Sequence, residues 1–243
     1  MGRLFTDEPA NFLLRKKQFA LVDDPDFCVR TARCLVRGKL LNQATLLGRI
    51  KRSHNQPAAG QAAASLRALA DKAQQAASVE TLRGLEGSGA ALYFRHLPLA
   101  LNKDWQFVRR GRRPPTDPVN AVLSLLYTLL TSRCYTAVRL AGLDPYPASL
   151  HSMAYGRQAL PLDLVEEFRP IVADTLTISL FNHRVLQADD FFSLPSESTR
   201  DGAAEEDAAV DVAVRDPLGQ MFPDAEVTET EYPVGEQEPP PVD

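Results

Sequence analysis

The sequence contains few cysteines, no long uncharged apolar run and no internal repeat, and each absence excludes a class of protein. Its three cysteines, Cys28, Cys34 and Cys134, are odd in number and lack CxxC spacing, so they predict neither a disulfide framework nor a zinc site. The longest charge-free apolar stretch, Val119–Ser132, has 14 residues, whereas a membrane-spanning helix needs roughly 20. The N-terminal residues include no apolar run of signal-peptide length. We therefore expect a cytoplasmic protein with no membrane partner.

Charge is divided unevenly along the chain. Residues 196–243 contain 14 acidic and two basic residues, a net charge of −12, which leaves 25 basic and 17 acidic residues and a net charge of +8 in residues 1–195. A basic body favours a polyanionic partner, and nucleic acid fits best. The acidic, proline-rich end has only two aromatic residues, a composition typical of disorder.

Few stretches alternate with period two, so we expect a mainly α fold. Asp24-Pro25 and Asp117-Pro118 each combine an N-capping residue with proline at the first helical position. Helices are predicted over residues 25–52, 58–77, 78–85 and beyond, 118–142 and 163–182, with a kink at Pro170. The predicted organisation is an N-terminal segment (1–24), a helical catalytic domain (25–195) and a disordered acidic tail (196–243).

Three carboxylates come close together in the last predicted helix. Asp163, Glu166 and Glu167 stand at positions i, i+3 and i+4, which lie on one face of a helix. Such a cluster costs stability unless solvent, arginine or a cation neutralises it. Arg169 alone cannot balance three carboxylates, so a metal ion becomes a reasonable partner.

Two further residues could complete such a site. Glu86 lies between glycines, and His151 lies in a loop between two apolar helices. Taken alone, Glu86 is as readily a solvated helix carboxylate, and a single histidine is more often a packing residue than a ligand. Carboxylates with one imidazole suit Mg²⁺ or Mn²⁺ better than zinc. A basic body around that site fits phosphodiester chemistry and predicts a nuclease-like enzyme.

Several ordered segments resemble one known family, the CRISPR-associated integrase/endonuclease of spacer acquisition (the Cas-one family). The match spans roughly residues 25–192. The segments are Arg37–Gln43, Leu82–Phe94, Arg113–Leu130, Gly142–Pro145, Leu150-His151, Gly156-Arg157 and Leu162–Pro170.

The resemblance implies a set of functional residues. Glu86, His151 and Glu166 match the positions that bind the metal and carry catalysis, and Asp163 is an additional acidic candidate.

The resemblance also implies residues that contact DNA. Arg157 matches a basic residue close to DNA, and Asn120 and Tyr127 lie in the motif that lines that region. The loop rich in arginine offers further phosphate contacts: Arg109, Arg110, Arg112 and Arg113.

The resemblance also implies an activity and partners. Members of the family insert short DNA fragments into a CRISPR array by transesterification, with Mg²⁺ or Mn²⁺, as homodimers bridged by the small Cas-two protein. They usually begin with a β-rich domain of about 80–100 residues, whereas about 24 residues precede the first matching helix here. We therefore expect a truncated form. The alternatives are a catalytically silent DNA-binding module and, less in keeping with the ordered motifs, an unrelated helical nuclease.

Overall fold

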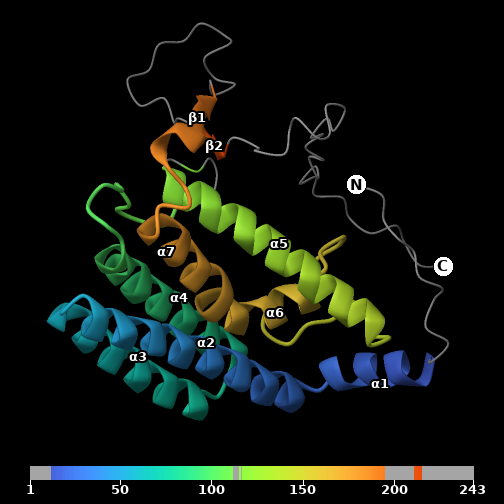
Figure 1. Cartoon of the computed structure of the whole chain (residues 1–243). Coiled ribbons are helices and arrows are strands. Elements are labelled where there is room, and N and C mark those ends of the chain that lie inside the picture. Colours follow the sequence, from blue (N-terminus) through green and yellow to red (C-terminus); the bar gives the residue numbers. More distant parts are fainter. Residues whose placement is uncertain (1–11, 112–114, 116, 195–210, 215–243) are drawn as a thin grey trace, which may run out of the picture.

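The computed structural model describes residues 12–111, 115, 117–194 and 211–214. These residues are mainly helical, as predicted (Figure 1). The helices are α1 (Phe12–Val22), α2 (Pro25–Ser53), α3 (Pro57–Gln75), α4 (Val79–His96), η1 (Leu97–Ala100), α5 (Pro118–Leu140), α6 (Ala159–Phe168), η2 (Arg169–Asp174), α7 (Thr175–Asn182) and η3 (Ala188–Asp190). The strands are β1 (Phe191–Leu194) and β2 (Asp211–Val214).

The helix α2 is the centre of the fold. It begins as predicted, because the Asp24 side chain accepts a hydrogen bond from the backbone N–H of Asp26 (2.9 Å) and Pro25 occupies the first turn. Its apolar face packs against α3 and α4 on one side and against α6 and η2 on the other. The core residues Val36, Leu40 and Leu47 are fully buried.

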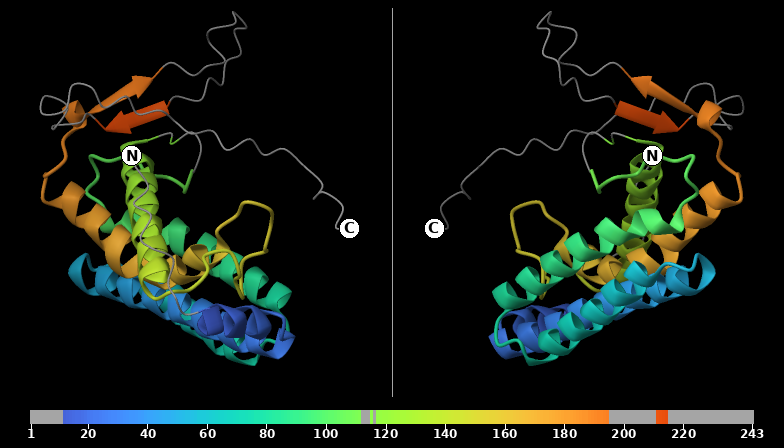
Figure 2. Two further views of the ribbon diagram at one scale, coloured as in Figure 1. Left: turned by 90° about the vertical axis from the view of Figure 1, so that its right-hand side faces the viewer. Right: turned by 90° about the vertical axis from the view of Figure 1, so that its left-hand side faces the viewer.

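A second layer consists of α5, α6, η2 and α7, in which α5 packs against the other three elements and stands nearly upright in the side views (Figure 2). The predicted kink at Pro170 is confirmed in the form of η2, a six-residue π-helical segment between α6 and α7. Proline cannot donate a backbone hydrogen bond, so the turn widens around it. The hydroxyl of Thr175 donates to the Pro170 carbonyl (3.0 Å) across this wider turn.

Two short elements form outside the predicted helical domain. No element was predicted before residue 24, but α1 forms there without burying a residue, and Gln18 exchanges two hydrogen bonds of 2.8 Å with the backbone of Asp144. In the tail that was predicted to be disordered, β2 pairs antiparallel with β1. Phe191 at the start of β1 stacks on Phe181, with ring centroids 6.0 Å apart. The remainder of the tail lies outside the described residues.

Among the described residues, α5 is the one helix whose length and apolar composition would suffice to cross a membrane. Composition alone cannot separate such a span from a core helix, and α5 packs against α6 and η2.

Candidate active site

Two of the predicted site residues meet at a single buried cation. Glu86 projects from α4 and Glu166 from α6, and the ammonium of Lys39, on α2, donates a hydrogen bond to each carboxylate. The side chains of Lys39 and Glu166 are 7% and 5% exposed, whereas that of Glu86 is 27% exposed. The site is therefore enclosed on the α2 and α6 sides and reaches solvent beside α4.

Two glycines let the three helices approach closely enough for this contact. A Cβ on Gly38 of α2 would lie 2.3 Å from a side-chain oxygen of Glu167 on α6. A Cβ on Gly89 of α4 would lie 2.2 Å from a methyl carbon of the fully buried Leu40 on α2. Both distances are far below van der Waals contact. The end of the Glu167 side chain can move away, but the buried Leu40 cannot, so close packing of α4 on α2 depends on the missing side chain at Gly89.

Glu166 is held ionised by two neighbouring cations. Besides the contact with Lys39, its Oε1 forms an ion pair with Nη1 of Arg169 at 2.8 Å. Burial opposes ionisation, but the charges of Lys39 and Arg169 outweigh it, and the pKa of Glu166 lies below its usual value. Within the predicted cluster of like charges, one lysine and one arginine neutralise Glu166 alone, and Glu167 lies against Gly38 of α2.

Asp163 holds the loop that carries His151. Its Oδ2 accepts the backbone N–H groups of Ser149 (2.8 Å) and Leu150 (2.9 Å), and its Oδ1 accepts that of His151 (2.9 Å). The same Oδ1 lies 2.8 Å from the Nδ1 of His151. A carboxylate bonded to Nδ1 fixes the ring and leaves Nε2 as the nitrogen that can bind a ligand. Asp163 is therefore a positioning residue for His151.

Tyr127 forms one wall of the site, between two guanidinium groups. Arg110 and Arg169 lie 5.3 and 4.8 Å from its ring centroid, within cation–π range. Its hydroxyl donates to Asp174 (2.6 Å), which also accepts from the hydroxyl of Tyr93 (2.6 Å). Burial raises the pKa of Asp174 to about 6, against the lowering effect of the two tyrosine hydrogen bonds. Burial and the Asp174 carboxylate both raise the tyrosine pKa values.

Asn120 holds the arginine-bearing loop against α5. Its side-chain oxygen accepts from Arg110 (2.8 Å) and from the backbone N–H of Gly111 (3.0 Å), and its amide donates to Asp117 and to the carbonyl of Arg109. The side chain is fully buried. Asn120 therefore acts by orienting Arg110 and does not itself face a ligand outside the protein.

The sequence of this chain matches a known family. The family model of CRISPR-associated protein Cas1 matches residues 1–200. The chain belongs to the Cas1 family. It corresponds to the helical C-terminal region of Cas1 proteins.

Two relatives and one solved structure describe how much of a Cas1 protein this chain represents. A CRISPR-associated endonuclease Cas1 from Thermus thermophilus is 40% identical over 177 residues, 73% of this chain and 51% of the relative, so the chain spans about half of its length. One from Leptospira interrogans is 37% identical over 190 residues, 75% of this chain and 74% of the relative. A partial Cas6-RT-Cas1–Cas2 complex contains a chain with a TM-score of 0.77 and 26% identity, covering 91% of this chain and 64% of that one.

The remaining residues predicted to bind DNA differ in their placement in this Cas1 chain. Arg157 is exposed in the loop after α5 and donates to the hydroxyl of Ser152 (3.2 Å). Arg109 is also exposed, beside the loop residues that Asn120 holds. Arg112 and Arg113 lie outside the described residues, so their role stays a prediction.

The donor set of this Cas1 site fits a hard divalent cation. Among the described residues no three His, Cys, Asp or Glu side chains already surround one point as metal ligands would. Glu86 and Glu166 nevertheless share one cation, the ammonium of Lys39, which marks a place where positive charge is held. Carboxylate oxygens with one imidazole nitrogen suit Mg²⁺ or Mn²⁺.

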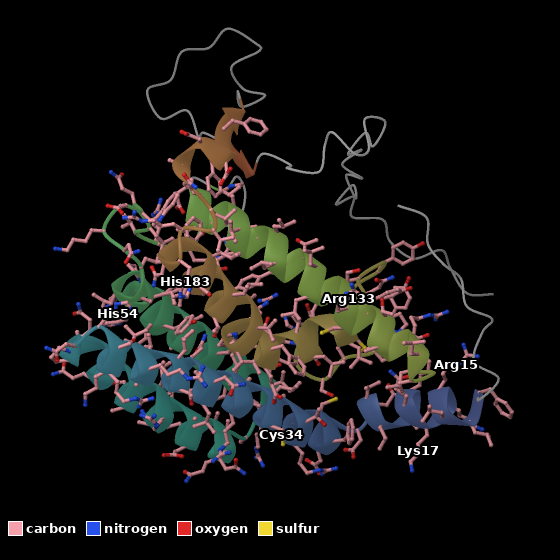
Figure 3. The ribbon with its side chains drawn as sticks, in the orientation of Figure 1. Arg15, Lys17, Cys34, His54, Arg133 and His183 are labelled. Atoms are coloured by element: carbon pink, nitrogen blue, oxygen red, sulfur yellow. The ribbon has the colours of Figure 1, made fainter. Side chains whose placement is uncertain are left out.

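His151 is the histidine best placed for such a role. The other three lie at helix ends: His96 contacts the carbonyl of Leu92 (2.9 Å) and His183 that of Ser179 (3.0 Å), each within its own helix. His54 follows the end of α2, and Figure 3 shows His54 and His183 at those positions.

His151 also lies close enough to Glu166 to contribute to the lowered pKa of that carboxyl group.

Sequence reasoning missed Lys39 and Asp174 as site residues. A signal for Lys39 was present, because it stands three residues after Val36 and four before Gln43, on the face of α2 that also carries Leu40. A lysine on the apolar face of a helix needs a buried acidic partner. Asp174 carried no such signal, since its two tyrosine partners are 47 and 81 residues away.

Proposed function

We propose that this chain carries the metal-dependent DNA endonuclease and integrase chemistry of CRISPR spacer acquisition. The observation that carries the proposal is the convergence of Glu86 from α4 and Glu166 from α6 on one buried positive charge, with His151 close enough to Glu166 to act on its pKa. These three side chains would hold Mg²⁺ or Mn²⁺, and Asp163 would keep the His151 ring in place. The names of the relatives, CRISPR-associated endonucleases, support the reaction class.

The reaction would be a transesterification on DNA. The 3′-hydroxyl of the incoming fragment attacks a phosphodiester of the CRISPR repeat, a new phosphodiester forms, and the displaced 3′-oxygen leaves with a proton. A bound divalent cation would activate the hydroxyl and stabilise the charge that develops on the phosphoryl oxygens. Arg110 and Arg169, which both lie within cation–π range of Tyr127, would bind phosphate oxygens beside the reacting group.

DNA would be held by the basic residues around this site. Arg109 and Arg157 are exposed on the two loops that flank it, and Arg112 and Arg113 follow Arg109 closely in the sequence. Two-ended integration would also need a homodimer and the small Cas-two (Cas2) partner, because two sites must be kept at a fixed separation. The likeness to a chain from a Cas1–Cas2 assembly supports that partner.

Strand transfer with matched variants tests the proposal. A labelled short duplex is incubated with a repeat-bearing plasmid and Mn²⁺, with Cas2 present or absent, and branched DNA is used to detect cleavage. We expect Glu86→Gln to reduce product formation by roughly 100-fold or more, because metal charge stabilisation supplies several kcal/mol. Glu80→Gln, an exposed carboxylate on the same helix, serves as the control. DNA binding without metal-dependent products in any condition would instead identify a catalytically silent DNA-binding module.

A further inference from the structure

Lys39 stands at the position where the divalent cation would be held. Its ammonium bonds to both Glu86 and Glu166, the two carboxylates that come from different helices. A dication within ligand distance of the same oxygens would lie against this ammonium, and two like charges in a buried site repel strongly. Either Lys39 moves when a cation binds or the site cannot accept one.

We propose that the ammonium of Lys39 has two alternative positions. In the metal-free site it bridges Glu86 and Glu166. When a divalent cation binds, it turns toward Gln43 and Asp174. The proposal rests on the metal site of the proposed function and adds a residue that sets metal affinity.

The structure offers a second position for the ammonium. A cavity of about 40 Å³ adjoins Lys39 and is also lined by Gln43, Glu86, Tyr127 and Asp174. The Oε1 of Gln43 is buried and has no hydrogen-bond partner among the described residues. A buried acceptor without a donor is uncommon and calls for an explanation. An ammonium that moves into the cavity would supply the missing donor.

The geometry of α2 favours this movement. Lys39 and Gln43 are four residues apart, so their side chains share one helix face. The four-carbon stem of lysine lets its ammonium change partners without a change in the backbone. Gln43 is 2% exposed, so the acceptor is fixed in the protein interior and not lost to solvent.

The charges at the second position also suit an ammonium. Asp174 lines the cavity, and its two oxygens each accept one tyrosine hydrogen bond, which leaves further acceptor capacity. Burial raises the pKa of Asp174, while the charge of Lys39 acts on it in the opposite direction through space. With a divalent cation between Glu86 and Glu166, the carboxylate of Asp174 would balance the displaced charge of Lys39.

Mn²⁺ affinity and thermal stability of the full chain test the proposal without an activity assay. Lys39→Met keeps the apolar stem and removes the competing charge, so Mn²⁺ should bind about tenfold tighter or more by isothermal titration calorimetry. Gln43→Leu removes the acceptor at the second position, so binding should weaken. Lys51→Met and Gln74→Leu, exposed on α2 and α3, are the matched controls and should leave affinity unchanged.

A second readout separates competition from misfolding. In EDTA, Lys39→Met should melt at a lower temperature than wild type, because Glu86 and the buried Glu166 lose a partner. Saturating Mn²⁺ should then raise its Tm by more than it raises that of wild type. A simple folding defect would lower the Tm equally with and without Mn²⁺, and that result would overturn the proposal.

Mn²⁺ binding by the variants separates a failure of the lysine proposal from a failure of the metal site. Unchanged or weaker Mn²⁺ binding by Lys39→Met, with binding abolished by Glu86→Gln, overturns the lysine proposal and leaves the metal site standing. Unchanged affinity of Gln43→Leu overturns the second position. Wild-type affinity in Glu86→Gln and Glu166→Gln overturns both the lysine proposal and the metal site of the proposed function.

Discussion

At the scale of single residues, Asp174 has the environment with the clearest consequence for stability. Its folded-state pKa of about 6 exceeds the ordinary value of 3.8, so the folded protein binds more protons than the unfolded chain between these two pH values. Its contribution to the free energy of unfolding therefore falls as pH rises through this window, by about 3 kcal/mol in total. The loss is nearly complete by about pH 7.

Asp174→Asn isolates this effect. The variant lacks the titrating group, so its stability relative to wild type should improve by about 2 kcal/mol between pH 4 and pH 7. Urea unfolding at intervals across that range measures the free energy of unfolding of the variant and of wild type. The titration of all other groups cancels when one value is subtracted from the other. A difference that stays constant with pH would mean that Asp174 ionises normally.

Asp163→Ala tests the role assigned to that carboxylate. Three backbone N–H groups, those of Ser149, Leu150 and His151, would lose their acceptor, at a cost of about 3 kcal/mol or more. Amide hydrogen exchange at these residues should accelerate, and the Tm should fall. Asp71→Ala, on the exposed face of α3, should change stability by less than about 0.5 kcal/mol. Unchanged exchange at residues 149–151 would contradict the assignment.

At the scale of elements, local signals in the sequence were sufficient for most helices. The capping pairs Asp24-Pro25 and Asp117-Pro118 predicted where α2 and α5 begin, and Pro170 predicted the break that η2 provides. The helix α1 was missed because it buries no residue and so has no apolar period to detect. The pairing of β1 with β2 joins segments on either side of the acidic stretch, which composition alone could not reveal.

Gly89→Ala tests the close approach of α4 to α2. The added methyl group would collide with the buried Leu40, and overpacking costs about 1–3 kcal/mol, against a gain of up to about 1 kcal/mol in helix propensity. We expect a lower Tm. In Gly87→Ala, on the same helix with nothing within 4 Å of the added carbon, propensity acts alone and the Tm should rise. Equal shifts in the two variants would show that the helices are not in close contact at Gly89.

At the scale of the whole molecule, the candidate site depends on contacts between distant parts of the chain. Sequence reasoning brought Glu86, His151 and Glu166 together through charge and family resemblance. It could not place Lys39 between them, because the contacts join residues 47 and 127 positions apart. It also assigned Asn120 to DNA, whereas burial gives that residue a part in holding Arg110.

Salt dependence of DNA binding tests the basic body as a whole. If about four arginines contact phosphates, the logarithm of the binding constant should fall with the logarithm of salt concentration with a slope of about −3 to −4. Fluorescence anisotropy of a labelled duplex measures it. Arg109→Gln should make the slope less steep by about 1, whereas Arg67→Gln, exposed on α3, should leave it unchanged. Binding that is insensitive to salt would contradict this account.

The central claim is that Glu86 and Glu166 share one cation site with His151. A crystal of the chain soaked in Mn²⁺ and measured at the manganese absorption edge tests it most directly. We expect one anomalous peak within about 2–2.6 Å of carboxylate oxygens from both glutamates. A peak elsewhere, or none at these residues with Lys39 still bridging them, would contradict the claim.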